Sequence, residues 1–352
     1  MKTYRDTVTG YEICQYTVGP ERNAKLYFST ENFSADDKYF FFTKAAVSEA
    51  DAADPVRAQY FRDGLYRATV ETGEIVQLAD DQYYSFAMHY NENYGVIARK
   101  DGMVLRLDIE TGEMKELGRL PDGARLQGHL TVSNDGRIAS SVQLKNKIYA
   151  LVILDPGEDH FKVVHMTDQW IGHTQICPCD SNQIFFIHET GGDALQRTWM
   201  FDVEYRMKRP YYVEHPNEWI THETWTADGQ NMIFMRCPHD IIYGDKDGRH
   251  FDVIYHASEE LLAHHPGISR DKQWVCTDTP WQDETGWHSA VHLVNPRNGK
   301  SIKLAQTYAS KTGADHLHPS FNRAGDKILF SAPNENGIAQ VCVIDLDQVE
   351  RP

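Results

Sequence analysis

A strand–turn–strand motif recurs seven times along the 352 residues of the chain. Each copy has a lead residue, a hydrophobic residue three positions later, a polar turn rich in Asp, Asn and Gly, and then an apolar run. This is the pattern of a β-hairpin. The clearest copies read HLTVSNDGRIAS, HETWTADGQNMIF, HPGISRDKQWVC and HPSFNRAGDKILF. The seven lead positions are 30, 85, 129, 173, 222, 265 and 318.

The spacing of these copies predicts a β-propeller. Successive lead positions lie 43 to 55 residues apart, close to the roughly 40–50 residues of a four-stranded propeller blade. Helical periodicity is almost absent, apart from a short piece near 258–264. We therefore expect an all-β, seven-bladed β-propeller in a single domain over residues 1–352. In such a ring the N-terminal YEICQYTVG and the C-terminal AQVCVIDLD would be strands of one blade.

Charge, hydropathy and cysteine content narrow the class of protein. The formal net charge of −16 argues against a nucleic-acid partner, because phosphate binding needs a basic surface. Neither GxGxxG nor GxxxxGK[ST] occurs, no apolar run approaches the length of a membrane span, and the N-terminus lacks the apolar core of a signal peptide. The six cysteines are too irregularly spaced for a disulfide framework. We expect a cytoplasmic protein with no membrane partner, and no feature indicates its oligomeric state.

Histidine occupies five of the seven lead positions, namely His129, His173, His222, His265 and His318. For any one of them alone, a structural role in its own blade is the simpler explanation. His316 lies outside the repeat, two residues before His318, so an extended backbone points both imidazoles to one side. With His265 they offer three nitrogen ligands and an open position, which is typical of a catalytic metal site. Since no cysteine lies beside them, Mn²⁺, Zn²⁺ or Fe²⁺ is favoured over a thiolate site.

Five short motifs follow one another between residues 172 and 321: GHTQ, HETGG, RTW, THETW and HLHPSF. Together they resemble the oligogalacturonate lyases. The resemblance runs from about residue 25 to the end of the chain and is strongest between 172 and 330. It implies an intracellular seven-bladed propeller, a carbon–oxygen lyase that cleaves short pectin fragments with a bound manganese ion.

The resemblance also implies roles for individual residues. The metal histidines of the family fall on His265, His316 and His318, its proposed Brønsted base on His222, and its substrate-facing arginine on Arg197. One position departs from the family pattern, because the glutamine that serves as a fourth ligand is replaced by Gly313. Water, Asp315 or the substrate would then complete the shell, and His264 competes with His265 as the ligand.

These residue types suit β-elimination from a uronate such as digalacturonate or unsaturated digalacturonate. A cation on the carboxylate makes the C5 proton more acidic, and a neutral imidazole at His222 can accept that proton. Arg197 can hold a carboxylate with two parallel hydrogen bonds. Further candidates for substrate binding are His173, Gln175 and His188, which fit equally well as satisfied polar groups of the blade core.

Two other functions fit the sequence. One is a non-catalytic propeller that acts as a scaffold or binds sugars, because the fold alone does not define an activity. The other is a lyase acting on a different oligouronide, which the departure at Gly313 keeps open. A propeller-linked serine peptidase is excluded by the lack of a GxSxG motif.

Overall fold

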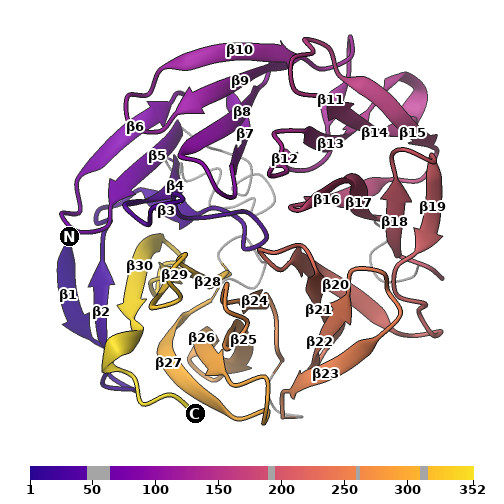
Figure 1. Cartoon of the computed structure of the whole chain (residues 1–352). Coiled ribbons are helices and arrows are strands. Elements are labelled where there is room, and N and C mark those ends of the chain that lie inside the picture. The colour runs from indigo at the N-terminus through magenta and orange to yellow at the C-terminus, as the bar shows by residue number, and fades with distance from the viewer. Residues whose placement is uncertain (46–63, 189–194, 259–261, 310–315) are drawn as a thin grey trace. The chain divides into compact units, whose positions relative to one another are not determined.

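The structure is a computed structural model that describes residues 1–45, 64–188, 195–258, 262–309 and 316–352. Its strands form seven sheets (Figure 1), in agreement with the seven blades expected from the repeat. The short helix expected near 258–264 overlaps residues 259–261, which lie outside the described part. The chain divides into two compact units, the first made of Met1–Asp81, Ile233–Tyr243 and Asp252–Pro352, and the second of Gln82–Met232 and Gly244–Phe251. The expectation of a single domain stays a prediction.

The first unit contains three complete sheets. The first sheet consists of β3 (Arg22–Lys25), β4 (Tyr39–Ala45), β5 (Gly64–Thr69) and β6 (Ile75–Ala79). The second consists of β24 (Gly267–Ile268), β25 (Val275–Asp283), β26 (Gly286–Val294) and β27 (Ser301–Tyr308). The third has the order β1 (Lys2–Arg5), β2 (Glu12–Gln15), β30 (Ala339–Asp345), β29 (Lys327–Pro333) and β28 (Ser320–Phe321). Strands from both ends of the chain therefore share this last sheet (Figure 1).

The second unit also contains three complete sheets. The first consists of β7 (Tyr83–Met88), β8 (Tyr94–Arg99), β9 (Met103–Asp108) and β10 (Met114–Arg119). The second consists of β11 (Arg125–Leu126), β12 (Thr131–Val132), β13 (Ile138–Gln143), β14 (Tyr149–Leu154) and β15 (Lys162–Thr167). The third consists of β16 (Ile171–Cys177), β17 (Asp180–His188), β18 (Thr198–Asp202) and β19 (Met207–Pro210). The boundary between the units falls within the seventh sheet, β20 (Trp219–Trp225), β21 (Asn231–Cys237), β22 (Asp240–Asp245) and β23 (Phe251–His256).

The helices of the described residues are two single 3₁₀ turns, η1 (Lys145–Lys147) and η2 (Leu346–Gln348). In the same part of the chain, no helix combines the length and the apolar character needed to cross a membrane.

The polar turns of the repeat share one hydrogen-bonding pattern. In four copies a Ser or Thr hydroxyl donates to an Asp carboxylate two residues later, and the same carboxylate accepts from the backbone N–H two residues further on. These side chains replace backbone partners in the turn, which is why Ser, Thr and Asp recur there. The four pairs are Ser34–Asp36, Ser133–Asp135, Thr226–Asp228 and Ser269–Asp271.

The core of each unit is formed by apolar faces of successive sheets. In the second unit Val96, Ile138 and Val152, from β8, β13 and β14, lie in one buried cluster. In the first unit Val291, Phe330 and Ile344, from β26, β29 and β30, do the same. Complete burial of one such side chain stabilises a fold by about 1.5–3 kcal/mol. This packing gives the site residues a rigid support.

Candidate active site

Three of the lead histidines adopt the left-handed backbone conformation that residues other than glycine usually avoid. Their φ angles are +45° at His173, +57° at His222 and +47° at His318. At His173 the pairing of β16 with β17 also shifts register between Gly172 and Gln175, so a bulge takes the histidine out of the regular ladder. Such conformations cost about 1–3 kcal/mol and tend to occur at functional sites.

A histidine cluster, made of His264, His265, His316 and His318, lies in the first unit. The ligand nitrogens of His264, His265 and His316 all lie within 4.8 Å of one another, a spacing suited to a metal ion. The ring centre of His318 lies 4.1 Å from that of His265 and 5.9 Å from that of His316. The structure thus brings together the three predicted ligands and adds His264, which had been the alternative to His265. Gly313 and Asp315 lie outside the described residues.

Burial favours the neutral form of three imidazoles in this cluster. It lowers the pKa of His316 to about 4, with Asp278 opposing the shift. It also lowers the pKa of His264, and it holds that of His318 well below the usual value. Neutral rings have a lone pair to offer, so the donor set fits a divalent transition metal.

Asp278, on β25, supports the cluster, and sequence reasoning did not single it out. Its buried carboxylate Oδ1 accepts from the backbone N–H of His265 at 2.9 Å and lies 3.0 Å from Nδ1 of the same residue. Its backbone oxygen accepts from the N–H of His264 at 2.8 Å. A carboxylate on Nδ1 fixes the ring and leaves Nε2 to a metal, as is usual for metal-binding histidines.

A second group of site residues lies in the second unit, on β16 and β20. Nδ1 of His173 lies 2.8 Å from Oε2 of Glu223, and Nε2 of Gln175 donates to the backbone oxygen of Glu223 at 2.7 Å. The side chain of Glu223 is fully buried at 0% exposure, whereas 25% of that of His173 is exposed. These contacts join the two strands next to His222, which precedes Glu223 in the chain.

Arg197 is held at the start of β18 by a buried carboxylate. Oε1 of Glu214 accepts from the backbone N–H of Arg197 at 2.7 Å and from that of Thr198 at 2.9 Å. Burial raises the pKa of Glu214, although these hydrogen bonds and the charge of Arg197 partly offset that effect. Glu214, like Glu223, was not among the residues predicted from the sequence, and it fixes the backbone from which the Arg197 side chain projects.

Gln175 and His188 occupy the interior of their sheet. The buried Gln175 amide donates to the Glu223 backbone, as described above, and its backbone oxygen accepts from the indole of Trp225 at 3.5 Å. His188 packs edge-on against Phe186 and Trp199, and burial lowers its pKa to about 4. Their predicted contact with substrate stays a prediction.

We expect the protein to lose stability in mild acid, because two of its buried histidines are neutral in the folded state. Burial lowers the pKa of His188 and of His292 to about 4, whereas an unfolded chain titrates near 6.5. Between pH of about 4 and about 6.5 the unfolded state therefore binds more protons than the folded state. The contribution of the two neutral histidines to stability is complete above pH of about 6.5 and is lost as the pH falls toward about 4. The slope is at most about 1.4 kcal/mol per pH unit for each histidine.

Urea unfolding at neutral pH and at mildly acidic pH, with a chelator present, measures this loss. His188→Phe should flatten the pH dependence, because Phe fits among the same aromatic rings and cannot bind a proton. His160→Gln is the control, since the side chain of His160 is 80% exposed. Equal free energies of unfolding at both pH values would contradict the prediction.

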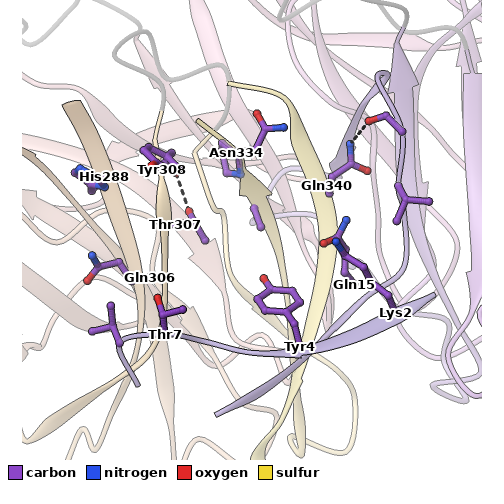
Figure 2. Close-up of a pocket in the computed structure, with 15 residues that line it drawn as sticks. Lys2, Tyr4, Thr7, Gln15, His288, Gln306, Thr307, Tyr308, Asn334 and Gln340 are labelled. Carbon is purple, nitrogen blue, oxygen red and sulfur yellow. Dashed lines mark hydrogen bonds between the residues drawn. The ribbon is translucent and has the colours of Figure 1, made fainter. Parts of the chain in front are cut away.

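A cavity of about 560 Å³ lies in the first unit, and Figure 2 shows the residues that line it. Residues of β1, β2, β26, β27, β29 and β30 and of their loops line it, among them Lys2, Tyr4, Gln15, Tyr308 and Asn334. None of its lining residues is a predicted site residue. We therefore do not identify this cavity as the active site, despite its size.

Comparisons with known proteins bear on the fold and on the class of protein. No protein-family model matches the chain. The oligogalacturonide lyase of Pectobacterium atrosepticum is 21% identical over an alignment of 371 positions, which covers 94% of this chain and 92% of that protein. The crystal structure of oligogalacturonate lyase from Vibrio parahaemolyticus matches with a TM-score of 0.81 at 18% identity, over 99% of this chain and 96% of that one. A structure of oligogalacturonate lyase in complex with manganese matches with the same TM-score and identity, over 98% of this chain and 95% of that one.

The structural likeness confirms the predicted fold class, so the seven sheets are the blades of an all-β, seven-bladed β-propeller. The sequence likeness runs over nearly the whole chain. In sequence the chain is similar to oligogalacturonate lyases, in agreement with the resemblance that its motifs had indicated. These relatives are named as lyases, in agreement with the predicted enzyme class, a carbon–oxygen lyase.

Proposed function

We propose that this protein is a metal-dependent lyase that cleaves short oligogalacturonides, such as digalacturonate or unsaturated digalacturonate, by β-elimination. The observation that carries the proposal is the cluster of four imidazoles, three of which bring their nitrogens within 4.8 Å of one another. A non-catalytic scaffold does not need a cluster of buried imidazoles. An elimination next to a carboxylate does need one, because the metal ion that the imidazoles can hold assists the reaction.

His265, His316 and His318 would hold the metal, with His264 within reach as a further ligand. Mn²⁺ is the metal proposed, because a relative of the same fold is described in complex with manganese, and another divalent ion would fit the same imidazoles. When bound, the cation neutralises the uronate carboxylate and stabilises the charge that develops beside it.

His222 would accept the C5 proton of the substrate. Its imidazole is half-buried on β20, and its backbone is held in an unusual conformation next to the fixed Glu223. Arg197 would bind a carboxylate of the substrate, since its planar guanidinium matches two carboxylate oxygens. His173, Gln175 and His188 are assigned to the substrate-binding surroundings.

Asp278→Asn should weaken Mn²⁺ binding by about 10–100-fold, the usual effect of removing the partner of a metal-binding histidine. The amide keeps the shape of the side chain but no longer supplies a negative charge to Nδ1 of His265. Calorimetric titration with Mn²⁺ measures the affinity. Asp271→Asn, in an exposed turn of the same sheet, is the matched control. Equal affinities in the two variants would show that Asp278 does not support a metal ligand.

The function is tested by following the ultraviolet absorbance of the unsaturated product during incubation with digalacturonate. We expect product to form, EDTA to abolish the reaction and added Mn²⁺ to restore it. Unsaturated digalacturonate and disaccharides of other uronic acids are assayed in parallel. Faster elimination from another uronate would change the assigned substrate, and no elimination from any of them would leave a sugar-binding propeller.

We also propose that the protein works in the cytoplasm. All six cysteines are free thiols in the structure, including the exposed Cys179, which suits a reducing compartment. Fractionation of cells that produce the protein would test this location.

A further inference from the structure

The His173–Glu223 pair has the arrangement of a proton-transferring imidazole backed by a carboxylate. Nδ1 of His173 faces Oε2 of Glu223 at 2.8 Å. The carboxylate is fully buried, and only the imidazole retains exposed surface. In the serine hydrolases a buried carboxylate on Nδ1 likewise orients the ring and stabilises its protonated form, while Nε2 exchanges the proton.

The carboxylate of this pair is ionised. Burial raises the pKa of Glu223, but the charge and hydrogen bond of His173 and the charge of Arg197 outweigh burial and hold it below its usual range. Its other oxygen, Oε1, is buried and has no hydrogen-bond partner within the described part of the chain. A buried ionic pair contributes little to stability compared with apolar packing, so stability alone does not account for this one.

The pair is also adjacent to the proposed base. Glu223 directly follows His222 on β20, and the hydrogen bond from Gln175 fixes the backbone of Glu223 against β16. His173 and His222 hold equivalent lead positions in successive sheets, and both have left-handed backbones. The two imidazoles thus hold equivalent strained positions, and the carboxylate that contacts one of them directly follows the other in the chain. Such a pair suits a reaction with two proton transfers.

β-Elimination from a uronide needs two such transfers. The C5–H bond breaks and gives up its proton, and the C4–O bond breaks and releases the other sugar. Without a proton that oxygen leaves as an alkoxide, which is a poor leaving group. A positioned general acid removes this difficulty and typically contributes about 10²–10⁴-fold to the rate.

We propose that His173 is the catalytic acid that protonates the leaving glycosidic oxygen, with Glu223 as its positioning residue. This inference rests on the lyase function proposed above. His222 takes the C5 proton, the electron pair of that bond becomes the C4=C5 double bond, and the C4–O pair goes to the oxygen. The oxygen takes the proton from Nε2 of His173. Afterwards His222 loses a proton to solvent and His173 gains one, so the enzyme is restored.

Leaving-group dependence tests this role. The substrates are digalacturonate and a galacturonate that carries a 4-nitrophenyl group on O4, whose phenolate leaves without a proton. On digalacturonate, His173→Ala should lower kcat by about 10²–10⁴-fold. On the aryl ether, the same variant should stay within about tenfold of the wild type, because no acid is needed. His222→Ala should be slow on both substrates.

Glu223→Gln should show the same dependence on leaving group as His173→Ala, with kcat lowered on digalacturonate and KM little changed. If Glu223 had a purely structural role, Glu223→Gln would lower kcat equally on both substrates. His160→Ala, far more exposed, is the control expected to match the wild type. Equal losses on both substrates, or no loss, in His173→Ala would overturn the assignment of the acid even if Glu223→Gln fails to fold. A wild-type protein that eliminates neither substrate would instead overturn the lyase function itself.

Discussion

Replacing His222 with asparagine should lower kcat on digalacturonate by about 10²–10⁴-fold, because a positioned general base contributes that much. Asparagine tolerates the left-handed backbone, so the +57° φ at this position can be kept. The melting temperature and the metal content should therefore change little. Steady-state kinetics, thermal melting and elemental analysis on the same preparation measure all three quantities.

His129→Asn is the matched control for that experiment. His129 leads the copy of the repeat around β12, was assigned no role in the site, and is not among the lead histidines with a positive φ. Its replacement should leave kcat unchanged. If His222→Asn instead melts at a lower temperature and keeps full turnover per folded molecule, the histidine is a structural lead residue and not the base.

Replacing His316 with alanine should lower the affinity for Mn²⁺ by more than the roughly 10–100-fold expected for a supporting residue, because a direct ligand is removed. Activity should fall in parallel and should recover partly at high Mn²⁺ concentration. The fold should survive, since His316 precedes β28 and pairs with no strand. Elemental analysis after dialysis and titration with Mn²⁺ give the result.

His264→Ala and His318→Ala decide which histidine completes the ligand set. The family resemblance assigns His318, whereas the structure places the ligand nitrogens of His264 within 4.8 Å of those of His265 and His316. The variant that loses more affinity identifies the ligand. Unchanged metal content in His316→Ala would place the metal elsewhere in the protein.

The repeat made most of the fold predictable. The lead residues His173 and His222 lie within β16 and β20, and His265 and His318 lie two residues before β24 and β28. One copy shows where the pattern is insufficient. The copy led by Thr30 predicted a strand near Phe33, but this residue forms an isolated bridge with Phe40, and β3 (Arg22–Lys25) provides the first strand of that sheet.

The histidines of the site were predictable, but the carboxylates that hold them were not. Asp278 lies 13 residues from His265, and Glu223 lies 50 residues from His173, so strand pairing and packing decide each partnership. In sequence, Asp278 is one of several polar residues in β25, and nothing distinguishes it from the others. Glu223 is visible within THETW, but nothing in that motif shows that its carboxylate meets a histidine of the neighbouring sheet.

The central claim, that the protein cleaves uronides by elimination, is tested most directly by product analysis in oxygen-18 water. Digalacturonate is incubated with the Mn²⁺-loaded protein, and the products are examined by mass spectrometry and ultraviolet absorbance. Elimination consumes no water at the cleaved bond, so we expect an unsaturated uronate and a galacturonate without oxygen-18 from the cleavage step. Saturated products in which one fragment carries oxygen-18 would show hydrolysis and would contradict the account.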